Sequence, residues 1–532
     1  MNVAFDPWIP VVNIAGELKL ASLIEVLTEG DKFSDLAVRP HERVSLMRLF
    51  ICVAHASLNG PKDYDEWCDV PDRLPDAVQK YLKDRNEKES FELFHPKKPW
   101  LQVAELKAIS NKNNKHTSPV ALLDFELATG NRSTFFDHEG LAVSRFIKPE
   151  RTALNLLTFQ NFSPSGGSPI AQWKKVKTSQ VGNPDSPCLS QSMAHCLLRG
   201  SSLIETLHLN LPTFENVAKG YQAFSINKES ITLSEVSLGK PVWHFFPNSP
   251  EKNSKQAINA TKTYIGRLVP ISRWIRLIDN SDQMYCCNGF KYDTFRDGFA
   301  PEPTAAVHVV SKRNKKGIES KEREVVKINP GRALWRELSA LLIKRTAFGI
   351  GGPLAVENAP NETGFDFQVC AITRDQASMD IALESVFHIS PSFRNNLTIY
   401  HAEVAGSKNV LGAEGYARKL GGAIEVYRQK IDGDWEKRLE RNKKNQWLLK
   451  EKLYSRATTH YWTTVETNLS LLMAHIEAIG TDKAMPTRKA WRNMLFATAS
   501  EAYKITCGHE TPRQMRAFAK GWQKLMEIQK NR

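Results

Sequence analysis

The sequence predicts an α+β protein with a large mixed α/β N-terminal region and a helical C-terminal region. Its 532 residues exceed the roughly 150 of an ordinary domain several-fold, so two to four units are expected. Hydrophobic residues make up 41% and charged residues 24%, which is typical of globular chains. Signals for short strands and turns recur up to about residue 390, and helical spacing dominates after about residue 393. We therefore expect a mixed α/β domain over 1–390 and an antiparallel bundle of about four helices over 391–532.

The N-terminal region opens with the signals of a hairpin. Trp8–Val12 is typical of a strand, a turn follows at Ala15-Gly16, and Leu18–Leu20 can return antiparallel. Residues 21–27 favour a helix. Residues 41–58 carry apolar side chains at helical spacing and predict a buried helix, which the turn-forming residues Asn, Gly and Pro then stop.

Short strands and loops are expected over much of the remaining N-terminal region. Residues 105–140 are polar and predict loops around short strands. A helix over 153–160 precedes a loop rich in Ser, Pro and Gly over 161–169. Residues 240–310 predict short strands and turns. The highly charged residues 311–327 predict a solvated hairpin or a mobile loop.

The C-terminal region carries the signals of a helical bundle. One helix is expected within 400–430, and the apolar residues between Trp435 and Leu472 suit one or two long amphipathic helices. Gly480 ends that run, and Pro486 opens a further helix. Thr511-Pro512-Arg513-Gln514 predicts the start of the last helix, because the threonine can cap it and proline suits the first helical position.

Basic residues are concentrated in the same C-terminal region. The chain has a net charge of +14, and residues 391–532 hold 25 Lys and Arg against 14 Asp and Glu, a net of +11. Such an excess favours a polyanionic partner. The last predicted helix has an apolar face of Met515, Phe518, Trp522 and Leu525. Its basic stripe consists of Arg513, Arg516, Lys520 and Lys524, which we expect to contact nucleic-acid phosphates.

Several classes of protein are disfavoured by the sequence. No segment approaches the roughly 18 uncharged apolar residues of a membrane helix, and the N-terminus has no signal-peptide pattern. We therefore expect a cytoplasmic protein without a membrane partner. The eight cysteines form no CxxC pair, which predicts reduced thiols and no zinc site.

Catalytic signals are weak throughout the chain. It contains no GxxxxGK[ST], HExxH or GxSxG pattern. Asp137-His138 is similar to the His-Asp pairs of metal phosphohydrolases, but no ordered set of further ligands accompanies it. We therefore expect a binding protein without a cofactor or a metal. A metal-dependent nuclease built on Asp137-His138 stays as the alternative.

Several motifs occur together in an order that is typical of one family. The chain begins Asp6-Pro7-Trp8-Ile9-Pro10-Val11, and Arg199-Gly200 precedes the segment 205–211. Gly266-Arg267-Leu268 then precedes Trp274-Ile275 and is similar to a strand motif of that family. Over nearly its whole length the chain resembles the CasA family, the large subunit of the type I-E CRISPR Cascade complex.

This resemblance implies a non-catalytic subunit of an RNA-guided complex in antiviral defence. In this family the large subunit reads a protospacer-adjacent motif (PAM) of double-stranded DNA through the minor groove and promotes duplex opening and R-loop formation. Base pairing with the guide RNA then supplies sequence specificity. The implied partners are the guide RNA, the other Cascade subunits, the target duplex, its displaced single strand and a separate helicase-nuclease.

The resemblance also implies which residues contact the target duplex. Ser165-Gly166-Gly167-Ser168 looks like the family's glycine loop, whose bare backbone approaches base edges. Lys291 looks like the lysine finger, with Arg296 as the alternative cation. Gln376, beside Asp375, looks like the glutamine wedge that separates the first base pair.

Two further surfaces follow from the resemblance and the charge pattern. Phe135 and Asp137 look like part of the loop that contacts the guide RNA or an adjacent subunit. The basic stripe is expected to carry the displaced strand or to pack on small subunits. A general single-stranded nucleic-acid-binding protein stays as a further alternative, and such a protein would not prefer a motif-bearing duplex.

Overall fold

The computed structural model divides the chain into two compact units. The first comprises Met1–Leu334 and Ala340–His388, and the second comprises Trp335–Ser339 and Ile389–Arg532. A single division after residue 390 was expected, and the five-residue segment Trp335–Ser339 departs from that pattern. The structure describes residues 1–88, 91–109, 117–127, 145–166, 170–178, 185–189, 192–225, 238–292, 302–313, 317, 319–329, 331–346, 350–359, 362–375, 378–432 and 443–530.

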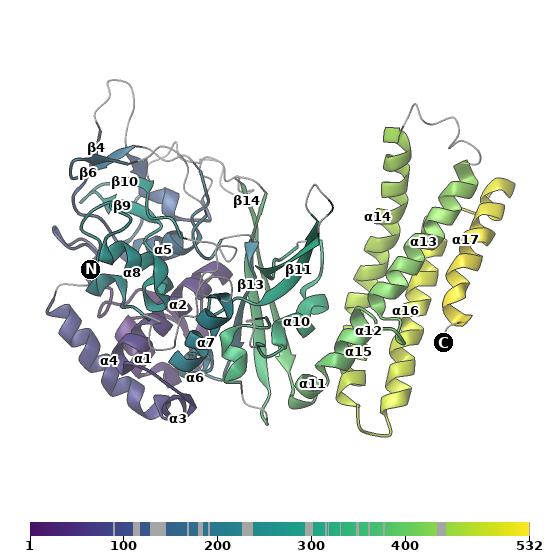
Figure 1. The fold of residues 1–532 in the computed structure, drawn as a ribbon, viewed down its shortest axis with the longest axis horizontal. Helices are drawn as coiled ribbons and strands as arrows, with labels where there is room; N and C mark the ends of the chain where they lie inside the picture. Colours follow the sequence, from purple (N-terminus) through teal and green to yellow (C-terminus); the bar gives the residue numbers. More distant parts are fainter. Residues whose placement is uncertain are drawn as a thin grey trace. The chain divides into compact units, whose positions relative to one another are not determined.

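The first unit mixes helices and strands, and the C-terminal region is helical (Figure 1). This arrangement confirms the predicted fold class. The helices of the first unit are α1 (Leu23–Thr28), α2 (Pro40–Leu58), α3 (Tyr64–Cys68), α4 (Val70–Asn86), α5 (Pro149–Phe162), α6 (Leu203–Asn210), α7 (Phe214–Ser225), α8 (Lys255–Lys262) and α9 (Tyr264–Leu268). Short 3-10 turns are η1 (Gly30–Lys32), η2 (Val120–Leu123), η4 (Val242–His244), η6 (Leu334–Glu337) and η7 (Leu354–Glu357), and α10 (Leu338–Leu342) follows η6.

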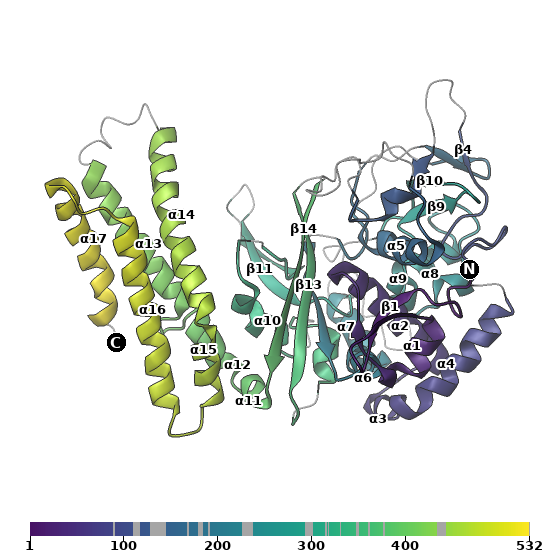
Figure 2. The same ribbon diagram turned by 180° about the vertical axis from the view of Figure 1, so that it is seen from behind.

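The sheets formed by the described residues are small. Their strands are β1 (Ile9–Asn13), β2 (Leu18–Ala21), β3 (Phe33–Leu36), β4 (Leu106–Ala108), β5 (Ser118–Pro119), β6 (Ala171–Trp173), β7 (Val176–Lys177), β8 (His195–Arg199), β9 (Arg273–Leu277), β10 (Gln283–Asn288), β11 (Val307–Arg313), β12 (Glu319–Val325), β13 (Phe365–Asp375) and β14 (Ser378–Ile389). The strand orders are β2-β1-β3, β5-β10-β9, β11-β12, β14-β13-β8 and β4-β6-β7. Figure 2 shows β13 and β14 running beside each other as the longest strands.

The predicted N-terminal hairpin and the following buried helix are both confirmed. β1 pairs antiparallel with β2, with Ile9 opposite Ala21. β3, which was not predicted from the sequence, pairs with the other edge of β1. α2 is buried along most of its length, and Asn59 ends it in the left-handed conformation with φ 51°.

The region 240–310 contains two helices that were predicted as strands and turns. Gly266–Leu268 belongs to α9, and the strand begins only at Arg273. Local capping explains this correction. The Ser254 hydroxyl accepts the backbone N–H of Ala257 at the start of α8, and the Thr263 hydroxyl accepts that of Gly266 at the start of α9. The charged segment 311–327 was predicted as a hairpin or a mobile loop, and the structure shows the hairpin, in which β11 pairs antiparallel with β12.

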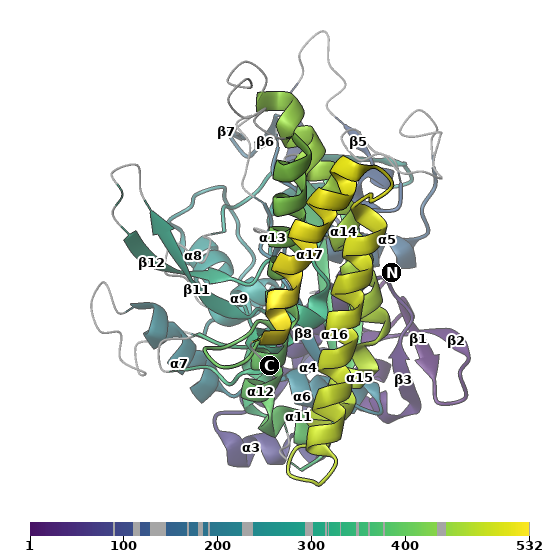
Figure 3. The same ribbon diagram turned by 90° about the vertical axis from the view of Figure 1, so that its right-hand side faces the viewer.

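Long helices dominate the second unit (Figure 3). The helices from Pro391 onward in the described part of the chain are α11 (Pro391–Asn395), α12 (Leu397–Val404), α13 (Ala413–Asp432), α14 (Lys443–Thr467), α15 (Leu469–Glu477), α16 (Ala484–Thr506) and α17 (Pro512–Lys530). Thr511 caps α17 as expected, since its hydroxyl accepts the N–H of Gln514 at 3.3 Å. The inward face of α17 matches the prediction at Leu525, which is buried, but Met515 is 51% exposed and the small residues Ala517 and Gly521 are buried instead.

The segment Trp335–Ser339 packs within the second unit. The hydroxyl of Tyr400 donates to the carbonyl of Trp335 at 2.7 Å, and both side chains are buried. The guanidinium of Arg336 lies 3.8 Å from the ring centre of Trp462 and forms an ion pair with Glu414 at 2.9 Å. These contacts place a short central segment of the chain among the C-terminal helices.

In the part of the chain that the structure describes, no helix combines the length and apolar character needed to cross a membrane.

Gly521 allows α17 to approach its neighbours closely, which predicts a measurable cost of any side chain there. A Cβ at Gly521 would lie 2.0 Å from the Tyr503 hydroxyl and 2.6 Å from the Ala423 carbonyl oxygen. Gly521→Ala should therefore lower the free energy of unfolding by about 1–3 kcal/mol in urea denaturation. Gly422→Ala is the matched control, since a Cβ there meets no atom within 4 Å. It should stabilise α13 by up to about 1 kcal/mol, and equal effects would contradict the assigned packing.

Candidate nucleic-acid interface

A buried serine network joins the end of α5 to the start of β9. The Ser272 hydroxyl donates to the carbonyl of Gln160 at 2.6 Å, and the Ser186 hydroxyl donates to Ser272 at 2.7 Å. The Ser163 and Ser186 hydroxyls are 2.5 Å apart, and the Ser163 side chain is fully buried. This network therefore fixes the position at which the chain leaves α5 and enters the following loop.

Gly166 lies at the exposed end of this loop start. Arg273 donates to the carbonyl of Pro164 at 2.5 Å, and the backbone N–H of Ser165 donates to the Asp185 carboxylate at 2.7 Å. Gly166 is exposed, and a Cβ placed on it would meet no atom within 4 Å. Its backbone consequently has open space around it, which a partner can enter.

Lys291 is held beside the same short segment of β9. The backbone N–H of Gly289 donates to the Ser272 carbonyl at 3.2 Å, and a Cβ at Gly289 would lie 2.6 Å from the Ser272 carbonyl carbon. Only glycine permits this approach. Phe290 and Tyr292 are 3% and 4% exposed, whereas Lys291 between them is exposed and makes no ion pair with any described residue. Ser272 therefore anchors both the Gly166 segment and the Lys291 segment.

A cluster of buried charges lies behind these segments. Arg48 of α2 forms an ion pair with Glu302 and donates from Nε to Asn161 of α5 at 3.0 Å. It also donates to the backbone carbonyls of Arg267 and Leu268 in α9, at 2.5 and 3.1 Å. Arg48 is 0% exposed and Glu302 is 3% exposed. The Arg48 guanidinium thus connects the long helices α2 and α5, the short helix α9 and Glu302.

Arg267 contacts the residues on both sides of the segment 293–301. Its guanidinium lies 5.3 Å from the ring centre of Tyr292 and 3.3 Å from the Glu302 carboxylate. Burial alone would raise the pKa of Glu302, but the positive charges of Arg48 and Arg267 lower it below its ordinary value. Glu302 is therefore ionised. Tyr292 and Glu302, which lie on either side of the segment 293–301, both contact the guanidinium of Arg267.

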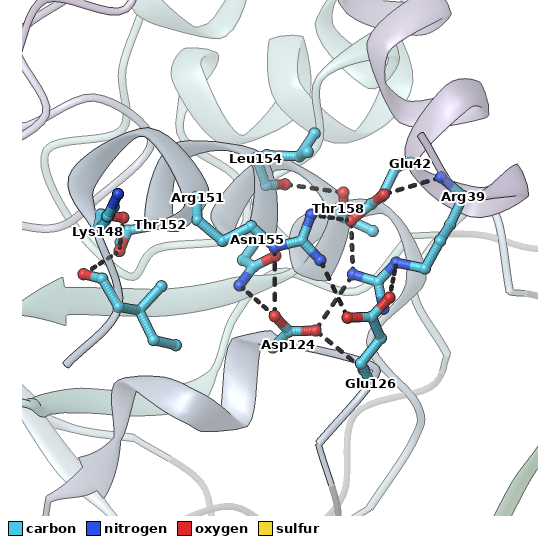
Figure 4. A network of polar contacts seen from close by, with 11 residues as sticks. Arg39, Glu42, Asp124, Glu126, Lys148, Arg151, Thr152, Leu154, Asn155 and Thr158 are labelled. Atoms are coloured by element: carbon cyan, nitrogen blue, oxygen red, sulfur yellow. Dashed lines mark hydrogen bonds and ion pairs between the residues drawn. The ribbon is translucent and has the colours of Figure 1, made fainter. Parts of the chain in front are cut away.

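A second polar cluster flanks the segment 128–144 (Figure 4). Arg39 pairs with Glu42 at 2.6 Å, with Asp124 at 3.2 Å and with Glu126 at 3.3 Å. Arg151 pairs with the same three carboxylates, at 2.9 Å, 3.3 Å and 3.9 Å respectively. Asp124 and Glu126 precede the segment and Arg151 follows it, so the cluster holds the flanking chain together.

Ionised carboxylates are favoured within this second cluster. Burial opposes ionisation of Asp124, but the backbone N–H of Glu126 and the charges of Arg39 and Arg151 outweigh it and lower the pKa of Asp124. Asn155 adds a hydrogen bond of 3.1 Å to the same carboxylate. The cluster is consequently a structural anchor in which every positive charge has an acidic partner.

The structure describes only some of the residues predicted to contact nucleic acid. Asp375 ends β13, and β14 begins at Ser378, so the predicted wedge falls between two adjacent strands. The backbone of Asp375 is described. The following predicted residues lie outside the described part of the chain: Phe135, Asp137, His138, Gly167, Ser168, Arg296 and Gln376.

The predicted basic stripe lies on the exposed side of α17. Arg513, Arg516, Lys520 and Lys524 are all exposed or partly exposed. Lys524 forms an ion pair with Glu527 at 2.7 Å, whereas the other three make none with described residues. Three cations of the stripe are therefore available to an anionic partner.

Among the described residues, no group of three or more His, Cys, Asp and Glu side chains is arranged to hold a metal ion.

Comparisons with known proteins agree on one family. The family model for CRISPR-associated protein Cse1 matches residues 2–502, which confirms the resemblance expected from the motifs. A curated relative, CRISPR-associated protein CasA/Cse1 of Thermus thermophilus, is 27% identical over 378 residues. That alignment spans 68% of this chain and 64% of the relative, slightly less than two thirds of its length.

Solved structures share the fold at low sequence identity. CRISPR-associated protein Cse1 from Acidimicrobium ferrooxidans has a TM-score of 0.70 and 17% identity, covering 99% of this chain and 97% of that one. A chain of a CRISPR RNA-guided surveillance complex has a TM-score of 0.70 and 16% identity, covering 99% of each chain.

The buried charge cluster predicts a large difference between two glutamate substitutions. Glu302→Gln leaves Arg48 and Arg267 buried without their counter-charge and should lower the free energy of unfolding by about 3–5 kcal/mol. Glu126→Gln is the control, because Glu126 is 61% exposed and its loss should cost less than about 1 kcal/mol. Chemical denaturation of the two variants measures both values. Equal costs would show that the Arg48 cluster does not organise the first unit.

Proposed function

We propose, since this chain belongs to the CRISPR-associated protein Cse1 family, that it is the non-catalytic large subunit of an RNA-guided Cascade complex. In this proposal the chain recognises the PAM of double-stranded DNA through the minor groove and promotes duplex opening and R-loop formation. It also helps to recruit a separate helicase-nuclease for antiviral defence. The likeness in fold to a chain of a CRISPR RNA-guided surveillance complex supports the proposal.

The observation that carries the proposal is the common attachment of Gly166 and Lys291 to the start of β9. Gly166 offers an exposed backbone with open space, and Lys291 is an exposed cation without an ion pair to described residues. Both segments bond to Ser272 or Arg273. A bare backbone and a lysine suit the acceptor-rich minor groove, where readout mainly separates A·T from G·C. We infer that Ser165, Gly166, Gly167, Ser168 and Lys291 form the PAM contact.

In this proposal the chain itself does not cleave DNA. Purified protein incubated with plasmid DNA and Mg²⁺ or Mn²⁺ should leave the DNA intact. Cleavage that disappears in Asp137→Asn and His138→Ala variants would instead favour the metal-dependent nuclease.

The PAM contact should be needed only while the target duplex is closed. We expect Lys291→Ala and Gly166→Gln to weaken binding of the assembled complex to an intact target by about 1–3 kcal/mol each. Gly166→Gln should still fold, because the added side chain enters open space. Binding is measured in parallel on a target already separated across the PAM and protospacer.

Matched controls distinguish this effect from a general change in charge or backbone. Lys344→Ala removes another exposed lysine, and Gly422→Gln adds a side chain at another open glycine. Both controls should bind as the native chain does. If Lys291→Ala and Gly166→Gln lose affinity equally on the closed and separated targets, the PAM assignment is wrong.

We propose that Gln376, beside Asp375, nucleates strand separation. Opening a base-pair step costs about 1–2 kcal/mol of stacking, which later heteroduplex pairing largely returns. Gln376→Ala should therefore slow R-loop formation on a linear target in stopped-flow measurements. Negative supercoiling or mismatches beside the PAM should restore the rate, because each supplies opening energy. Gln523→Ala, at an exposed position of α17, is the control. Equal slowing on matched and pre-opened targets would rule out the wedge.

The basic stripe is proposed to bind nucleic-acid backbone without sequence preference. Reversing Arg513, Arg516 and Lys520 should reduce the slope of log affinity against log salt by about 0.9 for each lost duplex contact. Adding Lys524→Glu should change the slope less, because Lys524 already pairs with Glu527. Reversal of three other exposed lysines, Lys252, Lys344 and Lys408, is the control of equal charge. Identical slopes in the two triple variants would exclude the stripe as a contact.

Phe135 and Asp137 are proposed to contact the guide RNA or an adjacent subunit. The ion-paired cluster around Asp124 supports this assignment by fixing the chain on both sides of their segment. Assembly of the complex from purified parts, with and without the Phe135→Ala substitution, tests the role of this segment.

A further inference from the structure

A cavity of about 440 Å³ in the first unit is lined by residues outside the proposed PAM contact. Its charged lining residues are mostly cationic. Glu105 supplies the one carboxylate among the lining residues that the structure describes. The cationic lining residues are Arg85, Lys88, Lys97, Lys98 and Lys174. They come from the end of α4, the segment before β4 and the turn between β6 and β7.

The turn that carries two of these lysines is fixed by one imidazole. Nδ1 of His95 accepts the backbone N–H groups of Lys97 and Lys98, at 3.1 and 2.8 Å. Lys98 Nζ also donates to the carbonyl of Lys88 at 3.5 Å. Lys174 occupies the left-handed region with φ 55°, a conformation that lysine rarely adopts outside tight turns. The backbone turns that carry these lysines are therefore fixed beside the cavity.

Most of the cavity's positive charges lack an acidic partner among the residues that the structure describes. Arg85, Lys88, Lys97 and Lys174 make no ion pair with any residue that the structure describes. The Arg85 guanidinium carbon lies 5.9 Å from the Tyr81 ring, and its Nε–H is buried without an acceptor among the described residues. Neighbouring cations without counter-charges repel one another, and a bound anion relieves that repulsion.

A chain of hydrogen bonds holds His244 at the cavity. Trp243 Nε1–H donates to the Tyr81 hydroxyl at 2.8 Å, and the same hydroxyl forms a hydrogen bond of 2.6 Å with His244 Nε2. Burial, followed by the charges of Arg85, Lys240 and Lys88, lowers the pKa of His244 to about 4 and keeps it neutral. Nδ1 of His244 makes no hydrogen bond to a described residue, so this ring nitrogen is open to a ligand of the cavity.

Trp100 carries a buried donor that has no partner among the described residues. This residue lines the cavity, is 2% exposed, and its indole N–H is buried without an acceptor among the described residues. Buried polar groups are nearly always hydrogen-bonded, so this indole N–H lacks its usual acceptor among the described residues. The cations of the lining suit a ligand that is rich in oxygen acceptors.

Aromatic side chains make the cavity suitable for a base as well as for a phosphate. Trp243 and Phe246 line it and are only partly buried. Bases stack on such π-faces with little sequence preference, whereas an acidic peptide would gain nothing from them. The volume also falls in the range of small-ligand sites and accommodates one nucleotide.

We propose that this cavity binds one nucleotide of a single-stranded nucleic acid, with its phosphate among Arg85, Lys88 and Lys97 and its base against Trp243 and Phe246. This contact goes beyond the proposed PAM function, because it needs neither a duplex nor a PAM. RNA and DNA share the chemistry that the cavity recognises. The free 2′-hydroxyl distinguishes them, and parallel RNA and DNA probes decide which is preferred.

The test uses the full chain with the basic stripe reversed, so that α17 does not contribute to binding. Fluorescent single-stranded probes of about eight nucleotides, rU and dT, are titrated at several salt concentrations. Lys88→Glu combined with Lys97→Glu should reduce the log–log salt slope by about 0.7 for each lost contact. Lys344→Glu combined with Lys408→Glu is the control of equal charge. A pocket variant that binds like this control overturns the proposal.

Photocrosslinking locates the contact independently of affinity. A thio-substituted uridine probe should crosslink to peptides that contain Trp100, Trp243 or Phe246. Binding of the probe should also raise the pKa of His244, followed by NMR, because a phosphate offsets the nearby cations. Crosslinks confined to other segments would overturn the proposal. Equal displacement of the probe by an oligoglutamate peptide would also overturn it, because the cavity would then recognise charge alone.

Discussion

The buried guanidinium of Arg48 is the constraint on which the first unit depends. A charge at 0% exposure is tolerated only when it is paired and its N–H groups have acceptors. Glu302 supplies the counter-charge, while Asn161 and the carbonyls of α9 accept its hydrogen bonds. The folded core therefore requires each of these partners in its place. The segments that carry Gly166 and Lys291 extend outward from this same core.

Sequence patterns predicted the elements whose signals are local. The apolar spacing of residues 41–58 and the capping pattern at Thr511 both correspond to observed helices. Short helices such as α9 were missed, because a five-residue element has too few positions to establish a period. Met515 was assigned to the apolar face of α17, but the small residue Gly521 takes the inward position that close packing requires.

The candidate site was only partly predictable for a related reason. Lys291 was identified through a family resemblance, and its buried neighbours Phe290 and Tyr292 became evident only in the structure. The buried role of Arg48 could not be predicted from the sequence, because it occurs within an apolar helix and its partners are 113 to 254 residues away. The geometry of this cluster arises from tertiary packing alone. The cavity near Trp243 likewise unites residues from three distant parts of the sequence.

The insertion of Trp335–Ser339 into the second unit has a consequence for how such chains can evolve. A C-terminal module that begins at Ile389 would lack the carbonyl that Tyr400 bonds and the guanidinium that covers Trp462. Recombination between related genes at a single crossover would thus separate residues that pack together. Inheritance of the helical unit is tied to a short stretch encoded upstream of β13, so the two units are expected to diversify in concert rather than by exchange.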